Sequence, residues 1–148
     1  LVYELAEFER APDAITNTLA DMERDGFGPQ PAFHFIVAEV DGKVVGVALY
    51  FLKYSTWKGR GLYLDDLIVT AKFRGKGIGK KLLDAFMEVA HQQGAKQVHW
   101  QVLDWNKPAI EFYKKAGVRV EPEWWDCKMD RDKIALYGKD DLDTVDRL

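Results

Sequence analysis

A glycine-rich turn between an apolar segment and an amphipathic helix constrains this chain more than any other feature. The residues are Val69-Thr-Ala-Lys-Phe-Arg-Gly-Lys-Gly-Ile-Gly-Lys-Lys81, and from Ile78 onward the apolar residues recur at helical spacing. Glycines let a backbone approach a ligand closely, and successive N–H groups at a helix N-terminus bind anions. The pattern therefore predicts a strand, an anion-binding turn and a helix within an α/β domain.

The spacing of the glycines excludes two common phosphate-binding motifs. The chain lacks G-x-x-x-x-G-K-[ST], and Gly75, Gly77 and Gly79 alternate with single residues instead of following G-x-G-x-x-G. Nucleoside-triphosphate hydrolases and most dehydrogenases are thereby excluded. Three basic residues add positive charge beside the glycines, namely Arg74, Lys76 and Lys80. The alternative interpretation is a glycine-rich turn that serves only to reverse the chain.

Hydrophobic periodicity predicts the other elements of a mixed α/β fold. We expect helices over residues 1–10, 13–24, 78–93 and 108–116, with Gly26 closing the second and Gly94 the third. We expect strands over residues 32–37, 43–52, 61–69 and 97–103, with Asp41-Gly42 as a tight hairpin turn. Two short strands through Val118, Val120, Trp124 and Cys127 and an irregular acidic tail from Gly138 complete the prediction.

Length and composition limit the class of protein. A chain of 148 residues with 47% hydrophobic residues is typical of one globular domain, here residues 1–148. The net charge of −3 argues against nucleic acid as a partner. No apolar stretch reaches the roughly 20 residues of a membrane span, and no signal peptide opens the chain. The single cysteine excludes an internal disulfide, which suits a reducing compartment. We therefore expect a cytoplasmic protein, and the lack of a long apolar stretch predicts no membrane partner.

The segment RGKGIG resembles the acetyl-CoA motif of the GNAT acetyltransferase superfamily. Further segments resemble its diamine (spermidine/spermine) acetyltransferase branch and, within it, the thialysine N-epsilon-acetyltransferases: ELAEFE, DGFG, YSTWKGR, YLDDLIV, VLDWN and IEFYKKAG. The resemblance covers residues 1 to about 128 and implies the GNAT fold, a mixed, mostly antiparallel sheet flanked by helices. It also implies a homodimer. Members begin with a strand, whereas this sequence starts within the first helix.

The resemblance implies acetyl-CoA as the cofactor and assigns residues to it. The strand before the glycine turn would separate from its neighbour and bind the pantetheine arm through its backbone, as an added strand would. The expected cofactor-binding residues are Leu67, Ile68, Val69, Arg74, Gly75, Lys76, Gly77, Ile78, Gly79, Lys80, Asn106, Lys107, Pro108 and Ala109. Asn106 can also cap the helix that follows it.

The same resemblance assigns the catalytic and substrate-binding residues. Tyr113 lies where the family has its general acid, and Asp65 lies where the family usually has a glutamate that acts on the amine directly or through water. Tyr113 as a core tyrosine remains the alternative. Strand alternation predicts that Asp65 and Asp66 point to opposite faces. The expected substrate-binding residues are Phe8, Glu9, Asp65, Asp66, His99, Trp100 and Gln101, with a solvated helix end and an ordinary strand as alternatives.

The predicted function is acetyl transfer from acetyl-CoA to a primary amine of a small cationic molecule, such as thialysine, a lysine analogue or a polyamine. Direct transfer in a ternary complex is expected. The alternatives are acetylation of a protein lysine or an antibiotic amine, and acetyl-CoA binding without turnover. An amino-acid substrate would also need a partner for its carboxylate, and Lys58, Arg60 and Gln101 are candidates. The histidines have no metal-ligand spacing, so no metal is expected.

Overall fold

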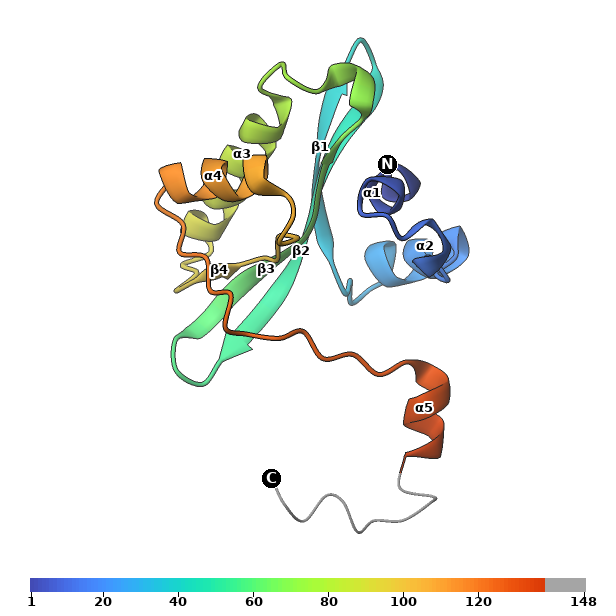
Figure 1. Ribbon diagram of the computed structural model, residues 1–148. Coiled ribbons are helices and arrows are strands. Elements are labelled where there is room, and N and C mark those ends of the chain that lie inside the picture. The colour runs from blue at the N-terminus through green and yellow to red at the C-terminus, as the bar shows by residue number, and fades with distance from the viewer. Residues whose placement is uncertain (138–148) are drawn as a thin grey trace. The chain divides into compact units, whose positions relative to one another are not determined.

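The computed structural model describes residues 1–137 and divides at Trp105 into two compact units, residues 1–105 and residues from 106 onward. The first unit is built on a four-stranded sheet of order β1-β2-β3-β4 (Figure 1). Its strands are β1 (His34–Val40), β2 (Lys43–Ser55), β3 (Gly59–Val69) and β4 (Val98–His99). The first three run antiparallel and β4 runs parallel to β3. The predicted mixed, mostly antiparallel sheet is confirmed.

The hairpin between β1 and β2 forms where the sequence predicts it. Asp41 and Gly42 both have positive φ values, 49° and 73°. Two consecutive residues with positive φ match the right-handed twist of the flanking strands, and Asp-Gly adopts this conformation readily. β2 continues to Ser55, three residues beyond its predicted end, because it pairs with β3 down to Gly59.

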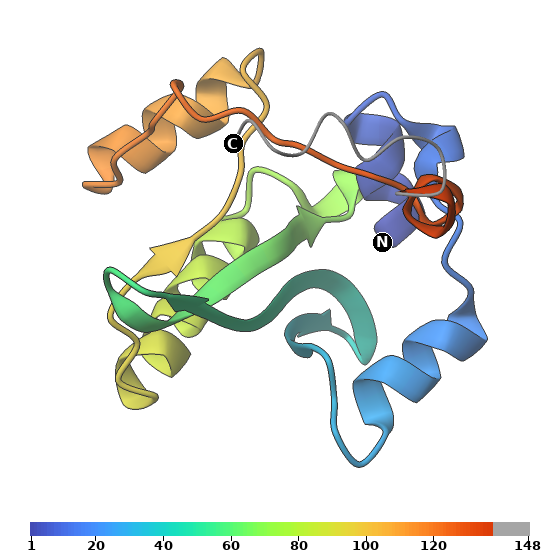
Figure 2. The same ribbon diagram turned by 90° about the horizontal axis from the view of Figure 1, so that it is seen from below.

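Helices cover both faces of this sheet (Figures 1 and 2). On one face lies α3 (Ile78–Gln92), whose fully buried Phe86 lies 5.5 Å from the ring of Tyr50 on β2. On the other side lie α1 (Val2–Phe8) and α2 (Leu19–Phe27). Gly94 ends α3 with a φ of 66°, as predicted. The core of the first unit therefore lies between α3 and the sheet.

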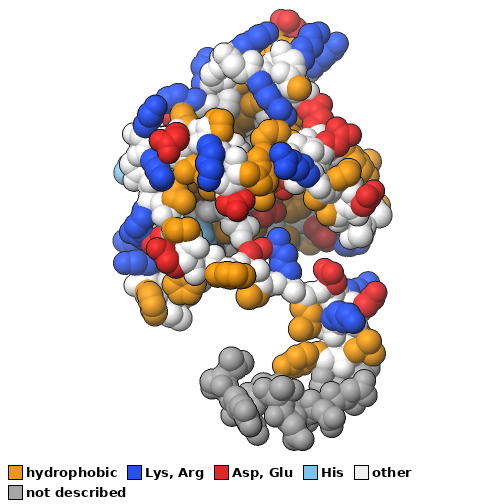
Figure 3. Space-filling view, viewed as in Figure 1, with side chains coloured by type: hydrophobic (Ala, Val, Ile, Leu, Met, Phe, Trp, Pro, Cys, Tyr) orange, Lys and Arg blue, Asp and Glu red, His pale blue; other side chains and the backbone are white. Residues whose placement is uncertain are grey.

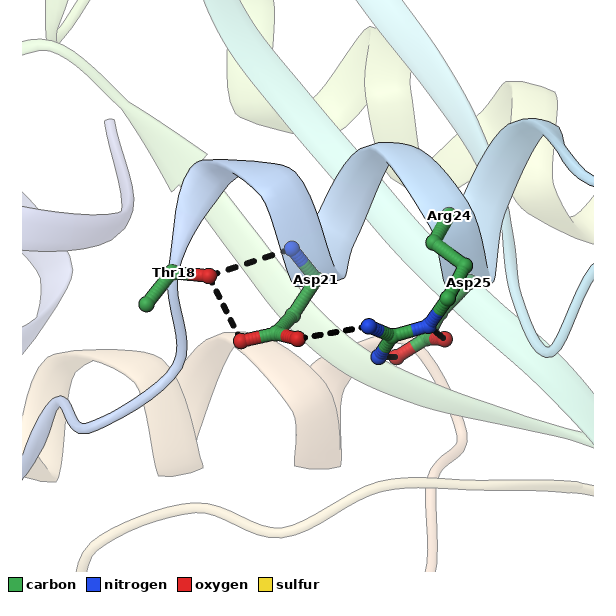
Figure 4. A network of polar contacts seen from close by, with 4 residues as sticks. All are labelled: Thr18, Asp21, Arg24 and Asp25. Carbon is green, nitrogen blue, oxygen red and sulfur yellow. Dashed lines mark hydrogen bonds and ion pairs between the residues drawn. The ribbon is translucent and has the colours of Figure 1, made fainter.

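The second helix differs from the prediction at both ends. Residues Pro12–Ala14 form a short 3₁₀ turn, and α2 begins only after Thr18. Thr18 Oγ1 accepts the backbone N–H of Asp21 at 3.1 Å, and an exposed network of Asp21, Arg24 and Asp25 continues from it (Figure 4). The predicted start at residue 13 is wrong because this N-cap, and not the spacing of apolar residues, sets the first turn.

The predicted cap at Gly26 is also wrong. Gly26 lies inside α2, and the helix ends at Phe27. Gly28 follows in an extended conformation, with φ −73°. The left-handed ending expected from the sequence is therefore absent at this helix.

The fourth strand is shorter than predicted. Only Val98 and His99 pair with β3, opposite Leu62 and Tyr63. The prediction of a strand over residues 97–103 is therefore wrong beyond His99. Within residues 1–105, β3 has no paired neighbour on this side from Leu64 onward.

The described part of the second unit, residues 106–137, has two helices and the segment between them. Helix α4 (Lys107–Lys115) ends two residues before Gly117, which has a φ of 83°, and α5 (Arg131–Leu136) follows. The two short strands predicted between residues 118 and 127 are wrong, because that segment contains none. The acidic tail predicted from Gly138 lies outside the described residues. No helix within residues 1–137 is long and apolar enough to cross a membrane.

Candidate active site

A β-bulge in β3 places the two adjacent aspartates. Asp66 pairs with Leu49 and Leu64 pairs with Tyr50, so Asp65 is the extra residue of the bulge. A bulge opposes two residues to one and interrupts the regular alternation of side chains. That Asp65 and Asp66 point to opposite faces stays a prediction at this irregularity. The charge of Asp65 acts on the carboxyl group of Asp66.

The carboxyl group of Asp66 has a strongly raised pKa. Burial, followed by the nearby charges of Asp65 and Glu9, raises the pKa of Asp66 from 3.8 to about 6. Desolvation and like charges both disfavour the ionised form. Glu9 belongs to the end of α1, so the fold brings the helix end and the bulged strand together. The three carboxylates form an acidic cluster consisting of Glu9, Asp65 and Asp66.

Aromatic and cationic side chains lie beside this acidic cluster. The guanidinium of Arg74 lies 5.2 Å from the ring centroid of Phe8, and Phe8 lies 5.7 Å from Trp105. Arg10 covers the Trp105 ring at 4.5 Å and adopts a positive φ of 62°, which is unusual for a residue other than glycine. Trp105 was not predicted as a site residue, and only its place in the family-like VLDWN segment could have indicated it.

The glycine turn has the conformation that an anion site requires. Gly75 and Gly77 have φ values of 73° and 78°, and no atom lies within 4 Å of the position that a Cβ would take at either residue. Gly77 is the N-cap of α3, so the first N–H groups of a 15-residue helix point into this open space. An acetyl-CoA pyrophosphate fits such a turn, which leaves room for backbone N–H groups to contact it.

The basic residues of the turn differ in their surroundings. Arg74 Nε donates to the carbonyl of Val69 at 2.8 Å and so fixes the start of the turn against the end of β3. Lys80 pairs with Asp84 at 2.6 Å, and the ammonium of Lys76 lies 5.0 Å from the Phe73 ring. All three residues are exposed, and Arg74 differs from the two lysines in its hydrogen bond to the backbone.

The strand edge expected to bind the cofactor is open. Leu67, Ile68 and Val69 pair with β2 on one side, and the pairing with β4 stops at Tyr63. Residues 100–103, which would continue β4, do not form a strand. The separation of the two strands that the family resemblance implies is therefore present in the first unit. The edge lies in the same chain segment as the bulge and the glycine turn.

The remaining predicted residues lie elsewhere. His99 on β4 pairs with Tyr63 on β3, which lies three residues before Asp66 in the same strand. Trp100 and Gln101 follow the end of β4. Asn106 begins the second unit and caps α4 by accepting the N–H of Ala109 at 3.4 Å, as predicted. Lys107 and Pro108 open that helix.

Tyr113 lies within α4, and burial raises the pKa of its phenol above the ordinary value of 10.0. The phenol therefore stays protonated at neutral pH, as a proton donor must. Its ring contacts that of Phe112 at 5.6 Å. Residues 1–137 contain no group of three His, Cys, Asp or Glu side chains placed to hold a metal ion.

The helix N-terminus at the glycine turn, the open strand edge and the carboxylates lie in one part of the first unit, an arrangement that suits an enzyme with an anionic cofactor. The model of the acetyltransferase (GNAT) family matches residues 2–118. The chain belongs to this family and is an N-acetyltransferase.

Relatives from a mammal and a nematode have the same name. The chain is 42% identical over 137 residues to the thialysine N-epsilon-acetyltransferase of Bos taurus, covering 86% of this chain and 81% of the relative. It is 32% identical over 141 residues to that of Caenorhabditis elegans, covering 93% and 87%.

A solved structure supports the fold alone. An aminoglycoside acetyltransferase from an uncultured soil metagenomic sample has a TM-score of 0.71 at 20% identity, covering 88% of this chain and 85% of that chain.

Proposed function

We propose that this N-acetyltransferase moves the acetyl group of acetyl-CoA to a primary amine of a small cationic molecule by direct transfer in a ternary complex. The observation that carries this proposal is the acidic cluster beside the open edge of β3 and the glycine turn. When bound, acetyl-CoA would supply an activated thioester carbonyl. The backbone of Leu67 to Val69 and the turn from Arg74 to Lys80 would hold it, together with Asn106 to Ala109.

The acidic cluster would recognise and deprotonate the amine. An alkylammonium has a pKa near ~10.4, so it must lose a proton before its nitrogen attacks the carbonyl carbon. Asp66 would bind the ammonium, and Asp65 would accept the proton directly or through water. The aromatic rings of Phe8 and Trp105 offer apolar and cation–π contacts to the alkyl chain of such a substrate.

Tyr113 would complete the reaction as the general acid. As the carbon–sulfur bond breaks, the Tyr113 hydroxyl would donate its proton to the departing thiolate. No covalent intermediate on the enzyme is required, and Cys127, an exposed thiol, takes no part. His99, Trp100 and Gln101 would contact the distal part of the substrate.

The names of the relatives favour amino acids and polyamines as acceptors. Four are thialysine N-epsilon-acetyltransferases, one is a spermidine/spermine N(1)-acetyltransferase-like protein and one is an L-ornithine N5-acetyltransferase. The substrates in these names all have an amine at the end of a flexible chain. On the face drawn in Figure 3, acidic and basic side chains are interspersed, which disfavours nucleic acid as a partner.

We further propose a homodimer in the cytoplasm. Trp57 is 86% exposed in the turn between β2 and β3, and Tyr54 is 70% exposed nearby. Large apolar side chains grouped on a surface favour contact with a partner, here a second copy of the chain. Light scattering at micromolar concentration should give twice the monomer mass, and monomer alone would contradict the dimer. The single cysteine, a free thiol, suits a reducing compartment.

The proposal is tested by thiol release from acetyl-CoA in the presence of thialysine, lysine, spermidine and 1,5-diaminopentane. Turnover with at least one amine is expected, and Asp65→Asn should lower it with every amine. The matched control is Glu39→Gln, an exposed carboxylate on β1, which should leave turnover unchanged. Binding of acetyl-CoA without turnover of any amine would instead support a protein that binds the cofactor without catalysis.

A further inference from the structure

The sheet face that carries Asp66 also carries a lysine farther along the same pair of strands. Asp66 pairs with Leu49, and Lys53 pairs with Gly61. Leu49, Phe51 and Lys53 alternate with Tyr50, which packs on α3. Since paired residues point to the same side, Lys53 and Asp66 share the face opposite α3.

Several contacts fix the position of the Lys53 side chain. Its ammonium is hydrogen-bonded to Nδ1 of His99 and lies 5.4 Å from the ring centroid of Tyr63. The Tyr63 ring is stacked on Phe51 at 5.1 Å and meets the His99 ring edge-on at 5.1 Å. An ammonium has only donors, so Nδ1 of His99 accepts and its Nε2 carries the N–H. The Lys53 ammonium therefore has further N–H donors besides the one bonded to His99.

A small pocket opens beside this cluster. The polar side chains among its lining residues are Lys53, Ser55, Gln97 and His99. Ser55 Oγ accepts the backbone N–H groups of Trp57 and Lys58, each at 3.2 Å, so its hydroxyl hydrogen can point to another acceptor. The pocket thus has the donors that an anionic group requires.

The spacing of Asp66 and Lys53 along the sheet leaves room for an amino acid with a terminal amine. Four residues of β2 separate the partner of Asp66 from Lys53, which corresponds to about 13 Å between backbone positions at ~3.3 Å per residue. In an extended lysine, six bonds of ~1.5 Å join the amine nitrogen to the carboxyl carbon, and because they zigzag they span roughly 7–8 Å. This length is shorter than the backbone separation, so the two side chains have room to contact the two ends through charge-assisted hydrogen bonds.

We propose that Lys53, with Ser55 and His99, binds the carboxylate of an amino-acid substrate whose terminal amine lies at the acidic cluster. This inference rests on the proposed function and specifies its substrate class. A diamine would bring a second ammonium toward Lys53, and this repulsion would disfavour it. Arg60, a candidate from the sequence, pairs with Tyr54 and so lies on the other face of the sheet.

Steady-state kinetics on lysine and on 1,5-diaminopentane, the same chain without the carboxylate, test the inference. Lys53→Met should lower kcat/KM for lysine about 10- to 100-fold, the effect of losing one charged hydrogen bond. It should leave the value for the diamine unchanged or higher. Lys53→Arg should keep most of the preference for lysine, because it restores the charge. The matched control, Lys43→Met at the exposed start of the same strand, should change neither value.

Two results would overturn the inference. An equal loss on both amines in Lys53→Met, with an unchanged melting temperature, would mean that Lys53 has no selective contact with a carboxylate. Wild-type enzyme that acetylates both amines with equal kcat/KM would leave the proposed function standing and refute the carboxylate site. Acetylation of neither these two amines nor the wider panel would instead refute the proposed function, and this inference with it.

Discussion

Replacing Asp66 by asparagine should stabilise the protein at neutral pH while lowering its activity. The pKa of Asp66 is raised from 3.8 to about 6, chiefly by burial and then by the charges of Asp65 and Glu9. A carboxylate held in such surroundings destabilises the folded state once it is ionised. Asparagine keeps the shape and removes the charge, so the variant should be free of this penalty.

The size and the pH window follow from the same shift. Asp66 contributes most favourably below pH 3.8, where it is protonated in both the folded and unfolded states. This contribution is lost as the pH rises from 3.8 to about 6, and it stays lost above that range. At about 1.4 kcal/mol per pKa unit, the full penalty is ~3 kcal/mol, and partial exposure to solvent reduces our expectation to about 1–2 kcal/mol.

Thermal unfolding at pH 8 and at pH 4 measures the effect. For a chain of this size, 1 kcal/mol corresponds to roughly 3 °C, so Asp66→Asn should melt about 3–6 °C above the wild type at pH 8 and close to it at pH 4. Glu39→Gln, the exposed control on β1, should show no difference at either pH. Equal stabilisation by Asp66→Asn at both pH values, or none at pH 8, would refute the reasoning.

Four further substitutions test other parts of the site and fold. Tyr113→Phe should lower kcat about 10²- to 10⁴-fold with little change in melting temperature, and wild-type turnover with chemistry limiting would exclude it as the acid. Gly77→Ala and Gly94→Ala, at φ values of 78° and 66°, should each lose about 1–2 kcal/mol in urea unfolding. Only Gly77→Ala should also weaken acetyl-CoA binding in calorimetry, and equal affinities would remove the turn from the cofactor site. Thr18→Ala should cost about 1 kcal/mol of stability without changing kcat/KM, and an unchanged urea midpoint would show the cap to be dispensable.

Local chemistry explains which elements could be predicted from the sequence. The Asp41-Gly42 turn, α3 and its Gly94 cap depend on residues close together in the chain, and all three are confirmed. The start of α2 also depends on a local signal, the Thr18 cap, whereas the helical spacing of apolar residues from Ile15 onward predicts an earlier start. The sequence pattern predicts no helix where α5 forms.

Long-range pairing explains the rest. Val98, Trp100 and Val102 alternate as in a strand, yet whether they pair depends on β3, some thirty residues earlier, and pairing stops at His99. The bulge at Asp65 likewise depends on how β2 and β3 align. The family resemblance predicts Asp65, Asp66 and the glycine turn as site residues, whereas Trp105 and Lys53 are proposed as site residues from their neighbours in space.

The bulge has a consequence for the length of the chain itself. Leu64 and Asp66 keep consecutive partners on β2, Tyr50 and Leu49, so a strand one residue shorter would continue the ladder without interruption. The sheet alone therefore has no need of Asp65, and the chain is one residue longer here than its scaffold demands. Deleting Asp65 should therefore preserve the pairing of the rest of β3 with β2 while removing one carboxylate from the acidic cluster.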